Sequence, residues 1–371
     1  MNRTSGTRFL EGIRSSFGVT LLNGTVVGQA VLGKVILVTG AGGSIGSALA
    51  RALGSFRPRH LILLDDSERN LNQVVTQLAS SIDSRQFSAV LGNVCDEERM
   101  LEIFGRYRPE VVYHAAAFKH VPLMEINPLA AVANNALATY NLAKLSRKKG
   151  VSSLILISTD KAVNPITIMG ASKRVAEVAL AALGNSKTRM SVIRLGNVLG
   201  TEGSVVPLFL SQISQGGPVT VTHRDATRYF LSLDEAVDLI LEASATRTGE
   251  LFIPRVIDPV NIWEMALEMI KKSNSENQRV IEISITGLRP GDKLSEEFLY
   301  PAETAATTDH PQLLRVLSAE RSSGEFELNM RRLASAVEAR DIASSLDAIC
   351  HLVPEYRPTE TVIRLSQGLP A

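Results

Sequence analysis

The segment STDKAVNPITIMGASK, residues 158–173, contains several side chains that can donate or accept protons. Thr159, Asp160 and Lys161 directly follow an apolar run, and Lys173 lies further along the same segment. A tyrosine four residues before Lys173 would supply an acid–base hydroxyl, but Met169 occupies that position and carries no exchangeable proton. Either the site is inactive, or proton transfer falls to other residues, for which Thr159, Asp160 and Lys161 are the candidates.

A parallel sheet would position these side chains. Apolar runs that alternate with helical segments predict crossover connections and a sheet covered on both faces. We therefore predict an α/β protein with a Rossmann-type doubly wound parallel sheet. Residues just past the carboxyl end of a strand face the ligand crevice of such a sheet. Adjacent Asp160 and Lys161 could also form a solvated ion pair, but this position favours a functional role. The predicted strands are 34–40, 60–65, 87–92, 110–116, 152–159 and 190–196.

A glycine-rich loop predicts the cofactor. VTGAGGSIGSALARAL, residues 38–53, places its glycines between a strand and a helix, where backbone N–H groups can bind a pyrophosphate. Asp65, at the end of the next strand, would bind an adenosine ribose and repel a 2′-phosphate, which favours NAD over NADP, although Arg69 is close. Lys173, as a fixed positive charge, would bind the nicotinamide ribose, beside an apolar wall at Met169. The predicted cofactor contacts are Gly40, Gly42, Gly43, Ser44, Ile45, Gly46, Asp65, Arg69, Asn93, Val94, Ala115, Ala116, Ala117 and Lys173.

The sequence pattern changes after about residue 197, where residues typical of turns become more frequent and the predicted strands become shorter. Amphipathic helices are predicted at 233–246 and 262–272, and we expect a smaller substrate lobe that completes a cleft. The predicted divisions are an N-terminal leader (1–33), an NAD-binding domain (34–197), a substrate-binding lobe partly interleaved with it (198–320) and a helical tail (321–371).

Composition narrows the functional classes. The 371 residues are 45% hydrophobic and 21% charged, with a net charge of +1, which argues for a packed core and against a protein that coats nucleic acid. Cys95 and Cys350 are far apart in the sequence and lack metal-ligand spacing, so we expect neither a disulfide nor a metal site. No apolar run approaches the ~20 residues of a membrane helix. We expect a soluble, cytoplasmic protein.

Six motifs together resemble the extended short-chain dehydrogenase/reductases, and within them the polysaccharide-biosynthesis 4,6-dehydratases that act on UDP-N-acetylglucosamine. The resemblance runs from about residue 34 to 300, and DHPQLLRV and the tail helices extend it to about 358. Many relatives have a membrane-spanning N-terminal region, and we expect none in this sequence. One branch of the family also has methionine at the position of Met169. The motifs are VTGAGGSIGS, YHAAAFKHVPLMEINPLAAVANN, STDKAVNPITIMGASKR, RLGNVLGTEGSVVPLF, GGPVTVTHRDATRYFLSLDEAV and TGLRPGDKLSEEFL.

The resemblance implies a reaction: hydride leaves C4 of the hexose for NAD⁺, water is eliminated across C5 and C6, and the hydride returns to C6. It implies Asp160 as the acid and Lys161 as the base. Burial should keep both neutral, by raising the carboxyl pKa and lowering the amine pKa. Thr159 is our candidate for relaying the C4 hydroxyl proton. The implied partners are a UDP-sugar and further copies of the chain, and the implied substrate contacts are Lys119, Asn197, Arg228 and Arg289.

Two alternatives stay open. A nucleotide-sugar epimerase would use the same cofactor, but it would need a proton-transferring tyrosine and no adjacent Asp–Lys pair. A silent regulator that binds NAD or a sugar nucleotide would not need the intact TDK segment.

Overall fold

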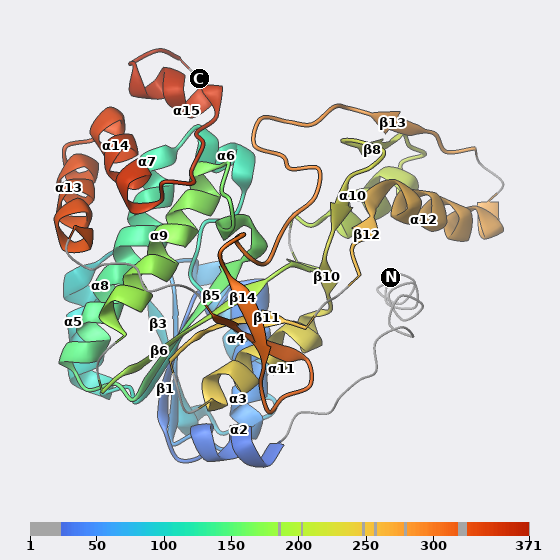
Figure 1. Cartoon of the computed structure of the whole chain (residues 1–371). Helices are drawn as coiled ribbons and strands as arrows, with labels where there is room; N and C mark the ends of the chain where they lie inside the picture. Colours follow the sequence, from blue (N-terminus) through green and yellow to red (C-terminus); the bar gives the residue numbers. More distant parts are fainter. Residues whose placement is uncertain are drawn as a thin grey trace.

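The computed structural model describes residues 24–184, 187–201, 203–246, 249–255, 258–277, 280–317 and 325–370. Its centre is a nine-stranded sheet in the order β14-β15-β11-β6-β5-β4-β1-β2-β3 (Figure 1). Neighbouring strands from β3 to β11 are parallel, and β15 and β14 extend the edge in antiparallel fashion. Every strand predicted from the sequence is present, and the α/β class is confirmed. The strands of this sheet are β1 (Val35–Thr39), β2 (His60–Asp65), β3 (Phe87–Leu91), β4 (Val111–His114), β5 (Ser153–Thr159), β6 (Arg189–Leu195), β11 (Leu251–Pro254), β14 (Thr304–Thr307) and β15 (Leu313–Leu317).

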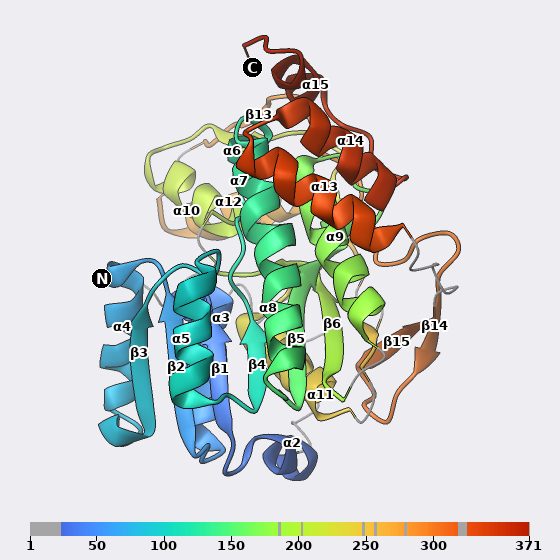
Figure 2. The same ribbon diagram turned by 90° about the vertical axis from the view of Figure 1, so that its left-hand side faces the viewer.

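Successive side chains along these strands enter two apolar cores, one on each face of the sheet. Leu37 and Leu154 lie in one core, whereas Ile36 and Ile155 lie in the other. This alternation requires helices on both faces, because each face is apolar and must be covered. Figure 2 looks onto the first face. Its helices are α5 (Glu97–Tyr107), α6 (Val121–Glu125), α7 (Pro128–Ala131), the π-helix η2 (Val132–Leu137), α8 (Ala138–Lys148) and α9 (Ile168–Leu183); the second face carries α2 (Gly24–Val31), α3 (Ser44–Ser55), α4 (Glu68–Ala79) and α11 (Leu233–Ala245).

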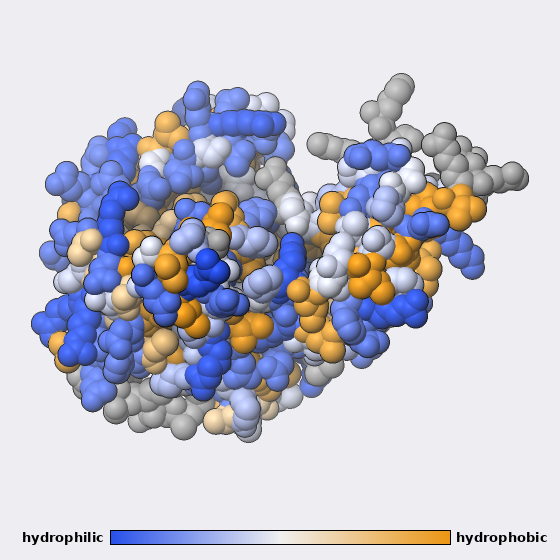
Figure 3. All heavy atoms as spheres, turned by 90° about the horizontal axis from the view of Figure 1, so that it is seen from above, coloured by the Kyte–Doolittle hydropathy of each residue, from blue (hydrophilic) through white to orange (hydrophobic). Residues whose placement is uncertain are grey.

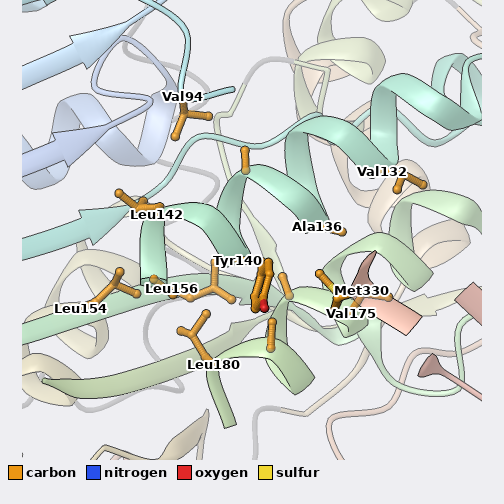
Figure 4. Close-up of a cluster of buried hydrophobic side chains, with 14 of the residues drawn as sticks. Val94, Val132, Ala136, Tyr140, Leu142, Leu154, Leu156, Val175, Leu180 and Met330 are labelled. Carbon is orange, nitrogen blue, oxygen red and sulfur yellow. The ribbon is translucent and has the colours of Figure 1, made fainter. Parts of the chain in front are cut away.

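The C-terminal helices extend the first core outward. α13 (Phe326–Glu338) and α14 (Ile342–Leu352) match the two predicted tail helices, and α15 (Glu360–Ser366) follows them. Met330 of α13 packs in the same cluster as Tyr140 of α8 and Val175 of α9 (Figure 4). The Tyr140 hydroxyl also donates a hydrogen bond to Glu327 at 2.6 Å. The tail therefore covers α8 and α9 and is part of the main core.

A smaller lobe has a core of its own, built around Phe209, Val219 and Met265. Seen from above, it forms a separate mass beside the main body, with apolar side chains on its surface (Figure 3). The predicted helix at 233–246 is present as α11, but it packs on the main sheet rather than in this lobe. The lobe elements are α10 (Val205–Ser214), β8 (Val219–Val221), β9 (Thr227–Arg228), β12 (Val260–Asn261), α12 (Ile262–Asn277) and β13 (Ile283–Ile285); β7 (Asn197–Val198) and β10 (Phe230–Leu231) join it to the sheet, and the short helix η1 (Ser84–Gln86) precedes β3.

The domain boundaries drawn from the sequence remain a prediction. Residues 1–23 of the predicted leader lie outside the described residues, and so do 318–324, where the lobe was expected to give way to the tail. Within the described part of the chain, no helix combines the length and apolar character needed to span a membrane.

Candidate active site

The glycine loop after β1 has the backbone geometry expected of a phosphate-binding turn. Gly40 adopts a φ of +65°, and a Cβ there would lie 2.6 Å from the backbone nitrogen of Ala116. A Cβ on Gly46 would lie 2.0 Å from the carbonyl oxygen of Gly40, so the helix approaches the loop too closely for any side chain. α3 begins at Ser44 with no side-chain cap on its first N–H groups. Those N–H groups are the ones that would bind a pyrophosphate.

Asp65 is already engaged with this loop. Its Oδ2 accepts the N–H of Gly42 at 2.7 Å, and its Oδ1 accepts the N–H of Ser67 at 2.9 Å. Burial raises the pKa of Asp65, and these two hydrogen bonds oppose that rise. Asp65 therefore shapes the loop as well as standing where a ribose was expected.

The remaining predicted cofactor residues lie along the same edge of the sheet or beside it. Arg69 is exposed on α4. Asn93 donates a hydrogen bond to Asp66 at 3.1 Å, next to buried Val94. Ala115, Ala116 and Ala117 directly follow β4, opposite the glycine loop. Their role as cofactor contacts remains a prediction.

The segment predicted to be catalytic turns through the short 3₁₀-helix η3 (Asp160–Ala162) directly after β5. The Thr159 hydroxyl donates to Asp160 Oδ1 at 2.9 Å, and Lys161 Nζ donates to the same oxygen at 3.0 Å. Asp160 is fully buried and the Lys161 side chain is 26% exposed. Among the described residues, Asp160 Oδ2 has no hydrogen-bond partner. The pair is therefore sheltered from solvent, and one buried carboxylate oxygen carries no hydrogen bond within this part of the chain.

The charge state of Lys161 differs from the sequence-based expectation. Burial lowers its pKa, but Asp160 and Glu296, whose Oε1 lies 3.5 Å from Nζ, more than offset this, so the pKa is raised. The expected neutral amine is wrong for this state, because the resting pair is an ion pair. The amine is neutral only after its proton has moved elsewhere.

Met169 and Lys173 lie on α9, one turn apart, as their spacing predicted. Met169 is buried, as expected of an apolar wall. Lys173 Nζ donates to the carbonyl of Ile157 at 2.7 Å, and burial lowers its pKa to about 8. Lys173 is therefore still mostly a cation at neutral pH, as expected, but it loses that charge at a lower pH than an exposed lysine.

Gly170 was not singled out from the sequence, yet it determines where Lys161 lies. A Cβ at Gly170 would lie 2.2 Å from the Lys161 carbonyl oxygen, which is backbone and cannot move aside cheaply. The Thr167 hydroxyl accepts the Gly170 N–H at 3.1 Å and fixes the start of α9. The signal in the sequence was the glycine directly after Met169, at the start of a helix.

We expect Gly170→Ala to displace the catalytic turn. The overpacking should lower the free energy of unfolding by roughly 1–3 kcal/mol, with a larger proportional loss of activity. Gly105→Ala is the control, because it lies within α5 with nothing within 4 Å of its Cβ position, so it should be neutral or stabilising. Urea unfolding and turnover of both variants test this, and equal effects would contradict it.

A buried network of ion pairs lies next to this turn and supports it. Arg194, fully buried on β6, pairs with Glu177 of α9 at 2.9 Å and with Glu303 at 2.7 Å. Burial raises the pKa of Glu177, but the nearby arginines and the Ser158 hydroxyl lower it to about 2. Tyr300, which stacks on Arg174, donates to the carbonyl of Ala162 at 2.7 Å. These contacts connect β6 and α9 to the segment that contains Tyr300 and Glu303, and they connect that segment to the turn after β5.

The four residues predicted to bind the substrate differ in their positions and in their present hydrogen-bond or ion-pair partners. Asn197 Oδ1 accepts a hydrogen bond from Lys161 Nζ at 3.2 Å, so it lies in the site. The Nε of Arg228 lies 4.0 Å from Glu296, but its NH1 and NH2 groups donate to the backbone carbonyls of residues 227, 293 and 294. Arg289 is exposed and paired with Asp292 at 3.0 Å, within its own turn. Lys119 is exposed in the loop after β4. Their contacts with a ligand remain predictions.

Asn135 is a further residue that the sequence did not single out. It lies in the π-helix η2, a distortion that is frequent at functional sites. Its side chain bonds both backbone groups of Phe118 and the Ser172 hydroxyl, at 2.9 to 3.1 Å. It therefore ties the loop after β4 to α9. The adjacent asparagines of the AVANN segment were the available signal.

Comparisons with known proteins agree with this architecture. Residues 36–318 match the model of the polysaccharide biosynthesis protein family. The capsular polysaccharide biosynthesis protein CapD of Staphylococcus aureus is 44% identical over 295 residues, 78% of this chain and 48% of that protein. A UDP-N-acetylglucosamine 4,6-dehydratase (inverting) of Campylobacter jejuni is 34% identical over 271 residues, 71% of this chain and 77% of that protein.

Among solved structures, the dTDP-glucose 4,6-dehydratase DesIV of Streptomyces venezuelae, with NAD and TYD bound, shares the fold. Its TM-score is 0.61 at 20% identity, covering 71% of this chain and 87% of that one. The chain spans about half the length of the first two curated relatives it matches. The family match over the whole sheet and lobe shows that this chain belongs to the polysaccharide biosynthesis protein family, within the extended short-chain dehydrogenase/reductases.

Proposed function

We propose that the protein is an NAD-dependent dehydratase that converts a UDP-N-acetylhexosamine, UDP-N-acetylglucosamine first of all, into a 4-keto-6-deoxy sugar nucleotide. The observation that carries this proposal is the sheltered Asp160–Lys161 pair at the carboxyl end of β5, on the same edge of the sheet as the glycine loop, which follows β1 two strands away. Elimination of water needs both an acid and a base, and an epimerase would need neither at this position. The similarity to a relative named for this reaction supports the same assignment.

The site fits NAD as the cofactor. The first N–H groups of α3, which begins at Ser44 without a side-chain cap, would bind the pyrophosphate, and Asp65, at the end of β2, would bind the ribose. A bound nicotinamide would take up and return a hydride. Lys173 would hold the nicotinamide ribose, and its pKa of about 8 makes its charge dependent on pH.

The chain's own groups would then handle the protons. Asp160 would protonate the departing C6 hydroxyl and Lys161 would accept the C5 proton, each contributing ~10²–10⁴-fold. The resting ion pair holds one proton on Lys161 Nζ, 3.0 Å from Asp160 Oδ1. Transfer of that proton along the hydrogen bond yields the neutral acid and the neutral base without any gain or loss of protons.

Incubation with UDP-N-acetylglucosamine in deuterated water tests the proposal. We expect NMR spectra to show a 4-keto-6-deoxy sugar nucleotide with deuterium at C5, formed without net consumption of NAD. Formation of the C4 epimer would favour the epimerase, and binding without turnover would favour a silent regulator.

Thr159→Val tests the relay from the C4 hydroxyl. The variant should lose ketone formation by roughly 10²-fold or more, because valine keeps the shape of threonine but cannot transfer a proton. Thr159→Ser should restore most of the rate. Reduction of bound NAD⁺ in a single turnover measures this step, and full activity in the valine variant would refute the role.

A further inference from the structure

Glu296 reaches the site from the segment that returns from the lobe. Its side chain is almost fully buried, and its Oε1 lies 3.5 Å from Lys161 Nζ. Among the described residues, its Oε2 accepts no hydrogen bond, and the Lys293 amine lies 3.9 Å away. A buried carboxylate that is this poorly satisfied is costly, so its position calls for an explanation.

Lys161 faces two carboxylates and one further cation. Asp160 lies 3.0 Å from its amine and Glu296 3.5 Å, while Asn197 accepts a hydrogen bond at 3.2 Å. Arg228, whose Nε lies 4.0 Å from Glu296, opposes them. If Asp160 were the only carboxylate near Lys161, the proton could pass between them, because the ion pair and the neutral pair have the same total charge of zero. The carboxylate of Glu296 stabilises the charged ammonium of Lys161 but not the neutral amine, so it favours the ion pair over the neutral pair.

We propose that Glu296 is a positioning residue that holds Lys161 protonated in the resting enzyme. Its contact with Lys161 must weaken before the amine can accept the C5 proton. Arg228 and Lys293 flank Glu296, and these two cations can pair with its carboxylate when a ligand enters the site. The proton on Nζ then passes to Asp160 Oδ1, which forms the neutral acid and base together. This inference rests on the proposed dehydration.

The titration of Lys161 tests it without relying on turnover. On the protein as purified, trace acetylation followed by mass spectrometry measures the rate at which Lys161 reacts, since only the neutral amine is acylated. At a fixed pH below its pKa, Lys161 in Glu296→Gln should react several-fold faster than in the wild type. Glu297→Gln is the matched control, because this neighbouring carboxylate is exposed and accepts a hydrogen bond from Asn164 at 2.9 Å.

Glu296→Asp provides a second variant if the glutamine variant does not fold. It keeps the charge but shortens the side chain, so Lys161 should react faster than in the wild type. Unchanged reactivity in folded Glu296 variants, or an equal change in Glu297→Gln, would overturn the inference. Where the wild type turns over UDP-N-acetylglucosamine, the acid limb of kcat/KM should move to lower pH in Glu296→Gln. Absence of wild-type turnover would refute the proposed function and leave the labelling result standing.

Discussion

Lys161→Met should abolish elimination of water while leaving the first oxidation intact. Methionine fills a similar volume but has no amine, so nothing at this position can accept the C5 proton. The loss should be at least ~10²-fold in overall turnover. Single-turnover absorbance should still show reduction of bound NAD⁺, and NMR should show no deuterium entering C5.

Lys148→Met is the control for this change, because that lysine is exposed in the last turn of α8. It should turn over like the wild type. If Lys161→Met loses hydride transfer and elimination equally, Lys161 is needed for binding or folding rather than as the base. If it still exchanges C5 with solvent, the assignment of Lys161 as the base is wrong.

Arg194→Met should cause the largest loss of stability. Among the described residues, it leaves buried Glu177 and Glu303 with Arg174 as their one remaining ion-pair partner, at 2.8 and 3.9 Å. Removing one partner of a buried ionic network typically costs about 3–5 kcal/mol, because the remaining charge is left uncompensated. Urea unfolding followed by circular dichroism measures the free energy of unfolding.

Arg315→Met is the matched control, on β15, which lies two strands away from β6 in the same sheet. Arg315 pairs with Glu250 at 3.0 Å and is 40% exposed, so its loss should cost about 0–1 kcal/mol. Equal losses in the two variants would show that the buried network contributes nothing beyond a surface pair.

The same network predicts how stability changes with pH. The folded pKa of Glu177 is lowered to about 2, below that of an unfolded glutamate, so its stabilising contribution is complete at neutral pH. That contribution is lost as the pH falls toward 2. In Arg194→Met this acid dependence should be weaker, because the pKa of Glu177 then lies closer to its unfolded value.

Much of the fold could be predicted from local patterns. The apolar runs that became β1 to β6, the glycine loop and the helical periodicity of α3, α5 and α9 each depend on residues close together in the chain. Backbone sterics at Gly40 and the alternation of apolar side chains act over a few residues, so a sequence displays them directly. The order of the motifs identified the family for the same reason.

The charge states and the supporting contacts of the site were decided only by the tertiary structure. Despite burial, the Lys161 pKa is raised by the adjacent Asp160 and also by Glu296, which lies more than a hundred residues later and is folded against it, and Arg194 is paired across the fold with Glu303. Likewise, α11 and β11 belong to the main sheet and its core, although they lie in the chain between lobe segments, with β9 before them and β12 after them. A pKa depends on burial and on charges a few ångströms away. Those distances are set by packing between distant segments, and no local pattern records them.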